Sequence, residues 1–125
     1  MNYPKKQISD KIVELYEKNR FLLKSDHMSD TEKARYISFL ENPMDEDISF
    51  KLNELSNYLS RYYKKKVIIL LDEYDTPMQE AYVNGYWEEL VAFTRSLFNS
   101  TFKTNPYLER AIMTGITRVS KESIF

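Results

Sequence analysis

Cysteine is absent from this chain, and glycine occurs only twice, as Gly85 and Gly115. Without cysteine the chain forms neither disulfides nor thiolate metal sites, which fits a reducing compartment. Two glycines so far apart exclude a phosphate-cradling loop built from these residues, because such loops need neighbouring glycines. His27 is the only histidine. It lies in a polar stretch, and we expect it to be solvated rather than to act as a ligand or in a catalytic triad.

A long hydrophobic run and an excess of one charge are also missing. The longest aliphatic run is Val67 to Leu71, and the first residues, MNYPKKQISDK, lack an apolar core. We therefore expect neither a signal peptide nor a membrane-spanning helix, and no membrane partner. Lys and Arg number 18 against 19 Asp and Glu, for a formal net charge of -1, so nucleic acid is not the expected partner. The simplest location is the cytoplasm.

Hydrophobic periodicity predicts four helices, three of them in residues 1–65. Apolar residues at helical spacing indicate helices at 7–24, from Ser29 through Leu40, at 48–62 and at 87–103. Ser29 followed by Glu32 is a capping-box pattern. Asn42 and Pro43 should end the second helix. The lysines at 64–66 are expected to be the solvated end of the third helix.

Two short apolar segments predict strands in residues 66–125. Five aliphatic residues without polar alternation, Val67 to Leu71, indicate a strand covered on both faces, as in the centre of a parallel sheet. The segment RAIMTG predicts a second strand at 110–114. A strand, a helix and a strand in this order form a βαβ unit with parallel strands. With its 125 residues, the chain fits one α/β domain with a helix-rich N-terminal half followed by a parallel βαβ unit.

Carboxylates follow the first predicted strand at once, in the sequence VIILLDEYD. Aliphatic residues ending in Asp-Glu are the Walker B pattern, in which the first acid orients Mg²⁺ and the second polarises the attacking water. These would be Asp72 and Glu73. The competing interpretation has Asp72 capping the next turn and Glu73 solvated. Asp75, just before Thr76 and Pro77, fits a turn residue better than a ligand.

The second predicted strand ends in TGITR. In the same scheme the neighbouring parallel strand presents a polar side chain near the γ-phosphate, and Thr114, Thr117 or Arg118 could supply it. An arginine there could stabilise charge in the transition state. The alternative is that Arg118 is an ordinary surface residue.

The segments KKVIILLDEYDTP and AIMTGITRVSKESIF together resemble the AAA-ATPase-like family of bacterial proteins, in which a P-loop ATPase domain usually precedes a PD-(D/E)XK nuclease-like domain. The resemblance implies a partial P-loop NTPase fold with Mg²⁺ and ATP as cofactors. It implies Asp72 as the Mg²⁺-orienting acid and Glu73 as the catalytic acid. TGITR would be the sensor-bearing end of its strand, with Arg118 catalytic and Thr114 and Thr117 contacting the nucleotide.

The chain departs from that family pattern at both ends. Members carry a glycine-rich P-loop upstream, and this sequence begins after the place where it should be. It also ends where relatives continue. We therefore expect a fragment that binds and hydrolyses ATP only with the missing P-loop, and no tight binding of Mg²⁺ or ATP by this chain alone. A P-loop strand would lie beside the 110–114 strand, so without it we expect an unpaired edge and possible self-association.

Two other functions remain open. The chain could be a non-catalytic interaction or structural module that keeps the ATPase-like core. The acids could also belong to a metal-dependent nuclease site, which would need a lysine near them, and Lys66 lies at the wrong end of its strand.

Overall fold

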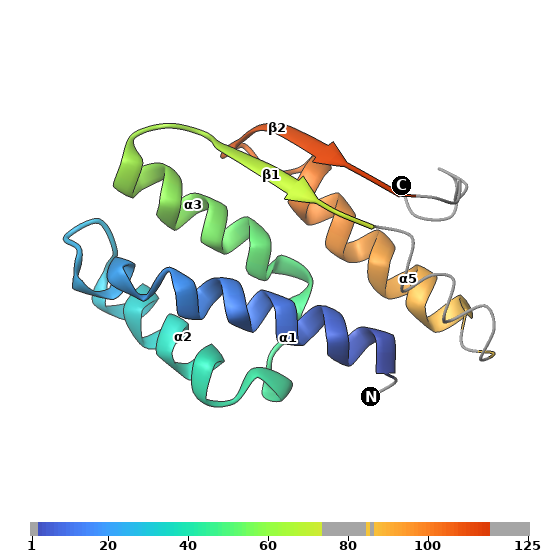
Figure 1. The fold of residues 1–125 in the computed structure, drawn as a ribbon. Coiled ribbons are helices and arrows are strands. Elements are labelled where there is room, and N and C mark those ends of the chain that lie inside the picture. The colour runs from blue at the N-terminus through green and yellow to red at the C-terminus, as the bar shows by residue number, and fades with distance from the viewer. Residues whose placement is uncertain (1–2, 74–84, 86, 116–125) are drawn as a thin grey trace.

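The computed structural model describes residues 3–73, 85 and 87–115, and Figure 1 shows their arrangement. This part of the chain is helix-rich with one small parallel sheet. Its elements are α1 (Tyr3–Lys18), a 3-10 turn (Arg20–Lys24), α2 (Asp30–Glu41), two 3-10 turns (Pro43–Asp45 and Ile48–Phe50), α3 (Lys51–Tyr63), β1 (Val67–Leu71), α5 (Trp87–Phe98), a π-helical turn (Asn99–Lys103) and β2 (Leu108–Met113). Among these helices none is long and apolar enough to cross a membrane.

The capping box predicted for the second helix is confirmed. The Ser29 side chain accepts from the Glu32 backbone N–H at 3.2 Å, and the Glu32 carboxylate accepts from the Ser29 N–H at 2.9 Å. The box satisfies two N–H groups that a helix start leaves without partners. α2 ends at Glu41, just before Asn42 and Pro43, as expected.

Two helix ends differ from prediction. The helix expected over 7–24 stops at Lys18, where the Asn19 side-chain amide donates to the Leu15 carbonyl at 2.7 Å and satisfies an orphan acceptor of the last turn. A 3-10 turn then continues to Lys24. The helix expected over 87–103 ends at Phe98 and widens into a π-helical turn, in which the Thr104 N–H donates to the Asn99 carbonyl at 2.9 Å.

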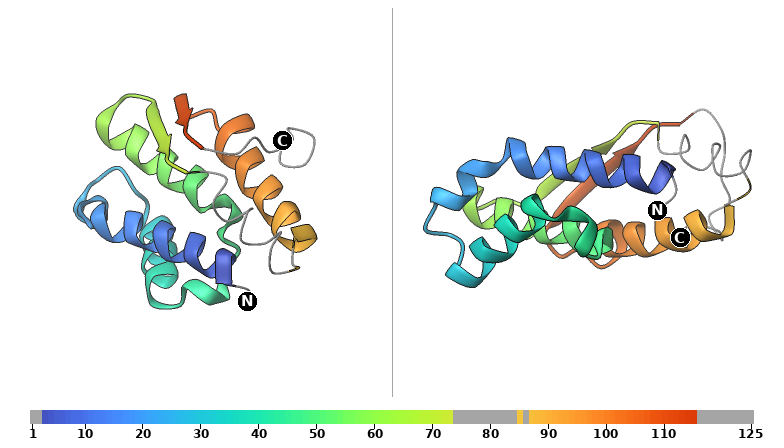
Figure 2. Two further views of the ribbon diagram at one scale, coloured as in Figure 1. Left: turned by 45° about the vertical axis from the view of Figure 1, so that its right-hand side comes forward. Right: turned by 90° about the horizontal axis from the view of Figure 1, so that it is seen from below.

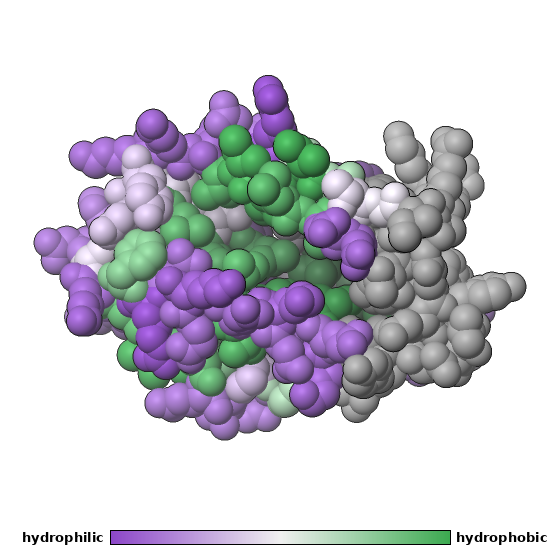
Figure 3. Space-filling view, in the orientation of Figure 1, coloured by the Kyte–Doolittle hydropathy of each residue, from purple (hydrophilic) through white to green (hydrophobic). Residues whose placement is uncertain are grey.

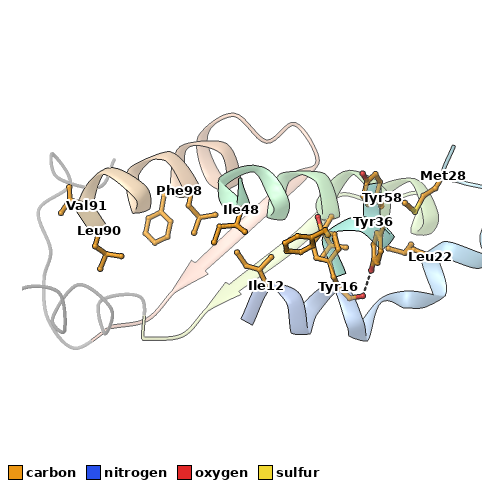
Figure 4. Close-up of a cluster of buried hydrophobic side chains, with 13 residues drawn as sticks. Ile12, Tyr16, Leu22, Met28, Tyr36, Ile48, Tyr58, Leu90, Val91 and Phe98 are labelled. Carbon is orange, nitrogen blue, oxygen red and sulfur yellow. Dashed lines mark hydrogen bonds between the residues drawn. The ribbon is translucent and has the colours of Figure 1, made fainter. Parts of the chain in front are cut away.

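Buried tyrosines join the first three helices in the core. The Tyr16 hydroxyl donates to the Lys51 carbonyl at 2.5 Å, and the Tyr36 hydroxyl donates to the Tyr16 carbonyl at 2.5 Å; Figure 4 marks the second bond among the core side chains. Burial raises the pKa of Tyr16 well above its ordinary value and that of Tyr58 to about 12. The hydroxyls of Tyr16 and Tyr36 link α1, α2 and α3 through the backbone.

Hydrogen bonds from polar side chains join α3 and the 3-10 turn before it to the segment that leads into β2. The Asn53 amide donates to the Ser100 carbonyl at 2.7 Å, and the Ser100 hydroxyl donates to the Ser49 carbonyl. Farther along, the Asn105 amide donates to the Ser56 hydroxyl at 3.1 Å. Since α3 leads into β1, these bonds fix the starting points of both strands relative to each other.

The two strands pair in parallel, as predicted, with β2 beginning at Leu108 rather than at 110. The Val67 N–H donates to the Tyr107 carbonyl at 2.8 Å, and this bond extends the pairing of β2 to residues before 110. The pairing runs from Val67 opposite Leu108 to Leu71 opposite Met113. It brings the carboxyl ends of both strands to one edge of the sheet.

The expectation that β1 is buried on both faces is wrong for the described residues. Exposure alternates along the strand, and Ile68, Leu70 and, on β2, Ile112 are 57%, 73% and 51% exposed. The reason is visible in Figure 1 and in the turned views of Figure 2, where the helices lie on one side of the sheet. Figure 3 shows the resulting hydrophobic surface above the sheet. The aliphatic run is therefore more hydrophobic than one-sided cover requires.

Candidate active site

Asp72 and Thr114 follow directly after the paired ends of β1 and β2. Leu71 is opposite Met113 in the register, so the next residue on each strand also meets its counterpart. The Thr114 N–H donates to the Leu71 carbonyl at 2.9 Å and extends the ladder by one bond. The topology therefore places a carboxylate and a hydroxyl side by side at the edge where open α/β sheets bind ligands.

The Thr114 hydroxyl connects the two acidic residues. It donates to Asp72 Oδ1 and accepts from the Glu73 backbone N–H at 3.2 Å. Asp72, Glu73 and Thr114 are all exposed, so the carboxylates are accessible to solvent and to a ligand.

Glu73 has a left-handed backbone, with φ of 54°. This conformation costs a residue with a Cβ about 1 kcal/mol or more, and it persists where surrounding contacts hold it. The bond from the Glu73 N–H to Thr114 is such a contact.

The structure brings together three of the five residues predicted for the site. Asp72, Glu73 and Thr114 form one connected group, whereas Thr117 and Arg118 lie outside the described residues. Asp75, Thr76 and Pro77 also lie outside them. The roles of these residues in catalysis and binding stay predictions.

Lys66, the lysine considered for a nuclease-type site, does not lie beside the acids. Lys66 precedes β1 and Asp72 follows it, so the strand separates them by roughly 20 Å at 3.3 Å per residue. A catalytic lysine of that kind must lie beside the acids, and Lys66 cannot do so.

The donor set of the site fits Mg²⁺ bound together with phosphates. Within residues 3–73, 85 and 87–115 no group of three or more His, Cys, Asp and Glu side chains could hold a metal by itself. Mg²⁺ does not require such a group, because it keeps several waters and usually takes one or two carboxylates plus substrate phosphates. One exposed carboxylate beside a hydroxyl oxygen meets the protein's share of that shell.

A family model described as Predicted AAA-ATPase matches residues 3–125. The chain belongs to the AAA-ATPase-like family. The comparison thus confirms, over nearly the whole chain, the resemblance seen in the sequence. The carboxyl ends of β1 and β2 therefore belong to an AAA-ATPase-like protein. Searches of curated proteins and of solved structures gave no match.

Sequence reasoning missed the backbone part of this site. The left-handed turn at Glu73 and the bond from its N–H to Thr114 carry no sequence signal, since glycine or asparagine is the usual mark of such a turn. The sequence also left open which of Thr114, Thr117 and Arg118 is the sensor. The register places Thr114 beside Asp72, and Thr117 and Arg118 lie outside the described residues.

Proposed function

We propose that Asp72, Glu73 and Thr114 form the acidic edge of a Mg²⁺-ATP site and that the AAA-ATPase-like protein containing them hydrolyses ATP. The observation that supports this most is the hydroxyl of Thr114 bonded to both Asp72 and the Glu73 backbone at the carboxyl ends of two parallel strands. This arrangement supports the assignment of β1 as a Walker B strand and of β2 as a neighbouring sensor strand.

Each residue has a separate role in this proposal. Asp72 would hold hydrated Mg²⁺, and Glu73 would orient a water and accept its proton as the water attacks the γ-phosphate. The Thr114 hydroxyl holds the Asp72 carboxylate in place and, through its bond to the Glu73 N–H, holds the turn that carries Glu73. Bound Mg²⁺ supplies charge neutralisation for the β- and γ-phosphates. Arg118 would add positive charge near the leaving group, and Thr117 a polar contact to the nucleotide.

A phosphate cradle has to come from outside these 125 residues. The two glycines are thirty positions apart, and two carboxylates alone repel a triphosphate. We therefore place the complete site in a longer protein, with a glycine-rich loop and its lysine joined upstream of this sequence. The chain by itself should show no measurable ATP hydrolysis.

The test of this assignment is nucleotide affinity as a function of Mg²⁺ in the longer protein. Asp72→Asn should raise the Mg²⁺ concentration needed for ATP binding and hydrolysis by about tenfold or more, because a neutral amide is a poor Mg²⁺ ligand. Thr114→Val should have the same direction of effect and a smaller size, whereas Thr114→Ser keeps the hydroxyl and serves as its matched control.

Two results would contradict the proposal. One is an unchanged Mg²⁺ requirement in Asp72→Asn, which would remove the metal role. The other is robust ATP turnover by residues 1–125 alone, which would show that the phosphate cradle lies within them.

One observation favours a second candidate, a non-catalytic interaction module. Ile68, Leu70 and Ile112 form an exposed hydrophobic sheet face, and large exposed apolar patches usually mark contact surfaces. If the chain acts only by contact, Leu70→Lys should abolish concentration-dependent self-association in analytical ultracentrifugation while Asp72→Asn leaves it unchanged. No self-association by the wild-type chain would count against this candidate.

A further inference from the structure

An exposed group of aromatic side chains lies at the end of the molecule opposite to Asp72. Phe21, from the turn after α1, and Tyr62 and Tyr63, from the end of α3, are 37%, 37% and 58% exposed. Their ring centroids are 4.9 to 6.4 Å apart, and His27 joins them with its ring 5.7 Å from Tyr62. We call these four residues the aromatic cluster.

Positive charge surrounds the aromatic cluster. The two segments that form it, 20–27 and 62–66, carry five Lys and Arg residues and one acid, Asp26. Arg20 is paired with Glu17. Lys24 and the three lysines at 64–66 are exposed, and within the described part of the chain no ion pair engages them. Hydrophilic side chains project at the upper left of Figure 3, where α3 ends and β1 begins.

The backbone places the lysines next to the rings. Lys64 ends α3 with a left-handed backbone, φ 58°, and the Lys65 N–H donates to the Ser60 carbonyl at 3.2 Å. Because Val67 is already hydrogen-bonded to Tyr107, the three lysines are confined to a short connection between Tyr63 and the sheet. The three lysines therefore lie within three residues of Tyr63 along the chain.

We propose that the aromatic cluster and its lysines bind single-stranded nucleic acid. Exposed aromatic rings offer faces on which unpaired bases stack, and neighbouring lysines contact the phosphates, which is how sequence-tolerant single-strand sites are built. The sequence alone favoured a solvated helix end for these lysines. The structure adds the aromatic rings, which a merely solvated helix end does not need.

Membrane lipid fits the same surface less well. An interfacial site needs a broad apolar face that inserts among acyl chains. Here the cluster offers one phenylalanine with two tyrosines and a histidine, whose polar groups suit base stacking and hydrogen bonding better.

The test is fluorescence anisotropy of a short labelled oligothymidylate titrated with the full 125-residue chain. The oligothymidylate should bind more tightly than the matching duplex. Between about 50 and about 200 mM salt its affinity should fall with a log-log slope of about -0.7 for each phosphate contacted. Tyr63→Ala should weaken binding by roughly 5- to 100-fold. Lys65→Ala with Lys66→Ala should flatten the salt slope.

Matched controls separate this site from a general effect. Phe50→Ala removes another exposed aromatic ring, 53% exposed, and Lys11→Ala removes another exposed lysine; both should bind like wild type. The proposal is overturned by no salt-dependent binding of the oligothymidylate, by equal losses in the controls, or by binding to vesicles of anionic phospholipid in its place. The surface is independent of the Asp72 site, and none of these results bears on ATP hydrolysis.

Discussion

The helical layer and the sheet of this protein differ in how completely they are buried. α1, α2 and α3 enclose Tyr16, Tyr36 and Phe39, each at most 1% exposed, and hydroxyl-to-carbonyl bonds join the helices. Within the described residues the sheet has two strands, one open face, and exposed polar residues at its carboxyl edge. Stability therefore resides mainly in the helices. The candidate chemistry lies on the more open part, where substitutions can change function without unfolding the chain.

The largest expected difference is between two leucines. Leu22 is fully buried and Leu70 is 73% exposed. Leu22→Ala should lower the free energy of unfolding by about 2 to 5 kcal/mol, because it leaves a cavity. Leu70→Ala should change it by about 0.5 kcal/mol or less. Urea denaturation of both variants measures this, and similar losses would mean that the open sheet face is covered in solution.

The tyrosine hydroxyls give the next largest effect. Tyr16→Phe removes the donor to the Lys51 carbonyl and leaves a buried acceptor without its partner, so it should cost about 1 to 3 kcal/mol. Tyr63→Phe removes a hydroxyl from an exposed ring and should cost less than about 0.5 kcal/mol. Thermal or urea unfolding distinguishes the two. A negligible cost for Tyr16→Phe would show that water replaces the lost bond.

A smaller effect is expected from the ion pair that joins α2 to α3. Arg61 Nη2 lies 2.6 Å from Glu32 Oε2, and the hydrogen bond from Arg61 lowers the pKa of Glu32 below 4.5. A carboxyl whose pKa is lowered by folding stabilises the fold above its unfolded pKa, and that contribution is lost as the pH falls through the folded pKa. Glu32→Gln keeps a capping-box residue and should lose about 1 kcal/mol or less at neutral pH.

The measurement for this pair is the free energy of unfolding at about pH 7 and about pH 3. Wild type should lose more stability on acidification than Glu32→Gln. Glu17→Gln is the control, because the pKa of Glu17 is also lowered, by Arg20, but that pair is exposed and joins only the end of α1 to the 3-10 turn that follows it. An equal acid response in wild type and Glu32→Gln would remove the role assigned to the pair.

Local patterns predicted the helices well, because the causes of a helix are local, and the order strand, helix, strand predicted the parallel pair. Ser29 and Glu32 lie three residues apart and cap α2 whatever surrounds them. The open face of β1 was not predictable, since an aliphatic run does not reveal which elements cover it. The ends of elements were also not predictable where they depend on distant contacts. One such end is the start of β2 at Leu108, which depends on the bond between Val67 and Tyr107.

The site was predictable as a pair of strand ends and not as a set of contacts. Asp72 and Glu73 follow an apolar strand, which is a sequence signal. The partnership of Thr114 with Asp72 depends on the register, and the left-handed turn at Glu73 depends on that partnership. The run YYKKK contains two members of the aromatic cluster and its three lysines. Phe21 and His27 join the cluster from a different segment of the chain.

The most direct test of the proposed catalytic role is ATP turnover by the proposed longer protein, in which a phosphate loop is joined upstream of this sequence, comparing wild type, Glu73→Gln and Asp75→Asn. Glu73→Gln should retain Mg²⁺-ATP binding and lose about 10²- to 10⁴-fold in turnover, because the amide keeps the shape of the side chain and cannot accept the proton. Asp75→Asn should turn over ATP nearly as fast as wild type. Unchanged turnover in Glu73→Gln would contradict the catalytic role assigned to this edge of the sheet.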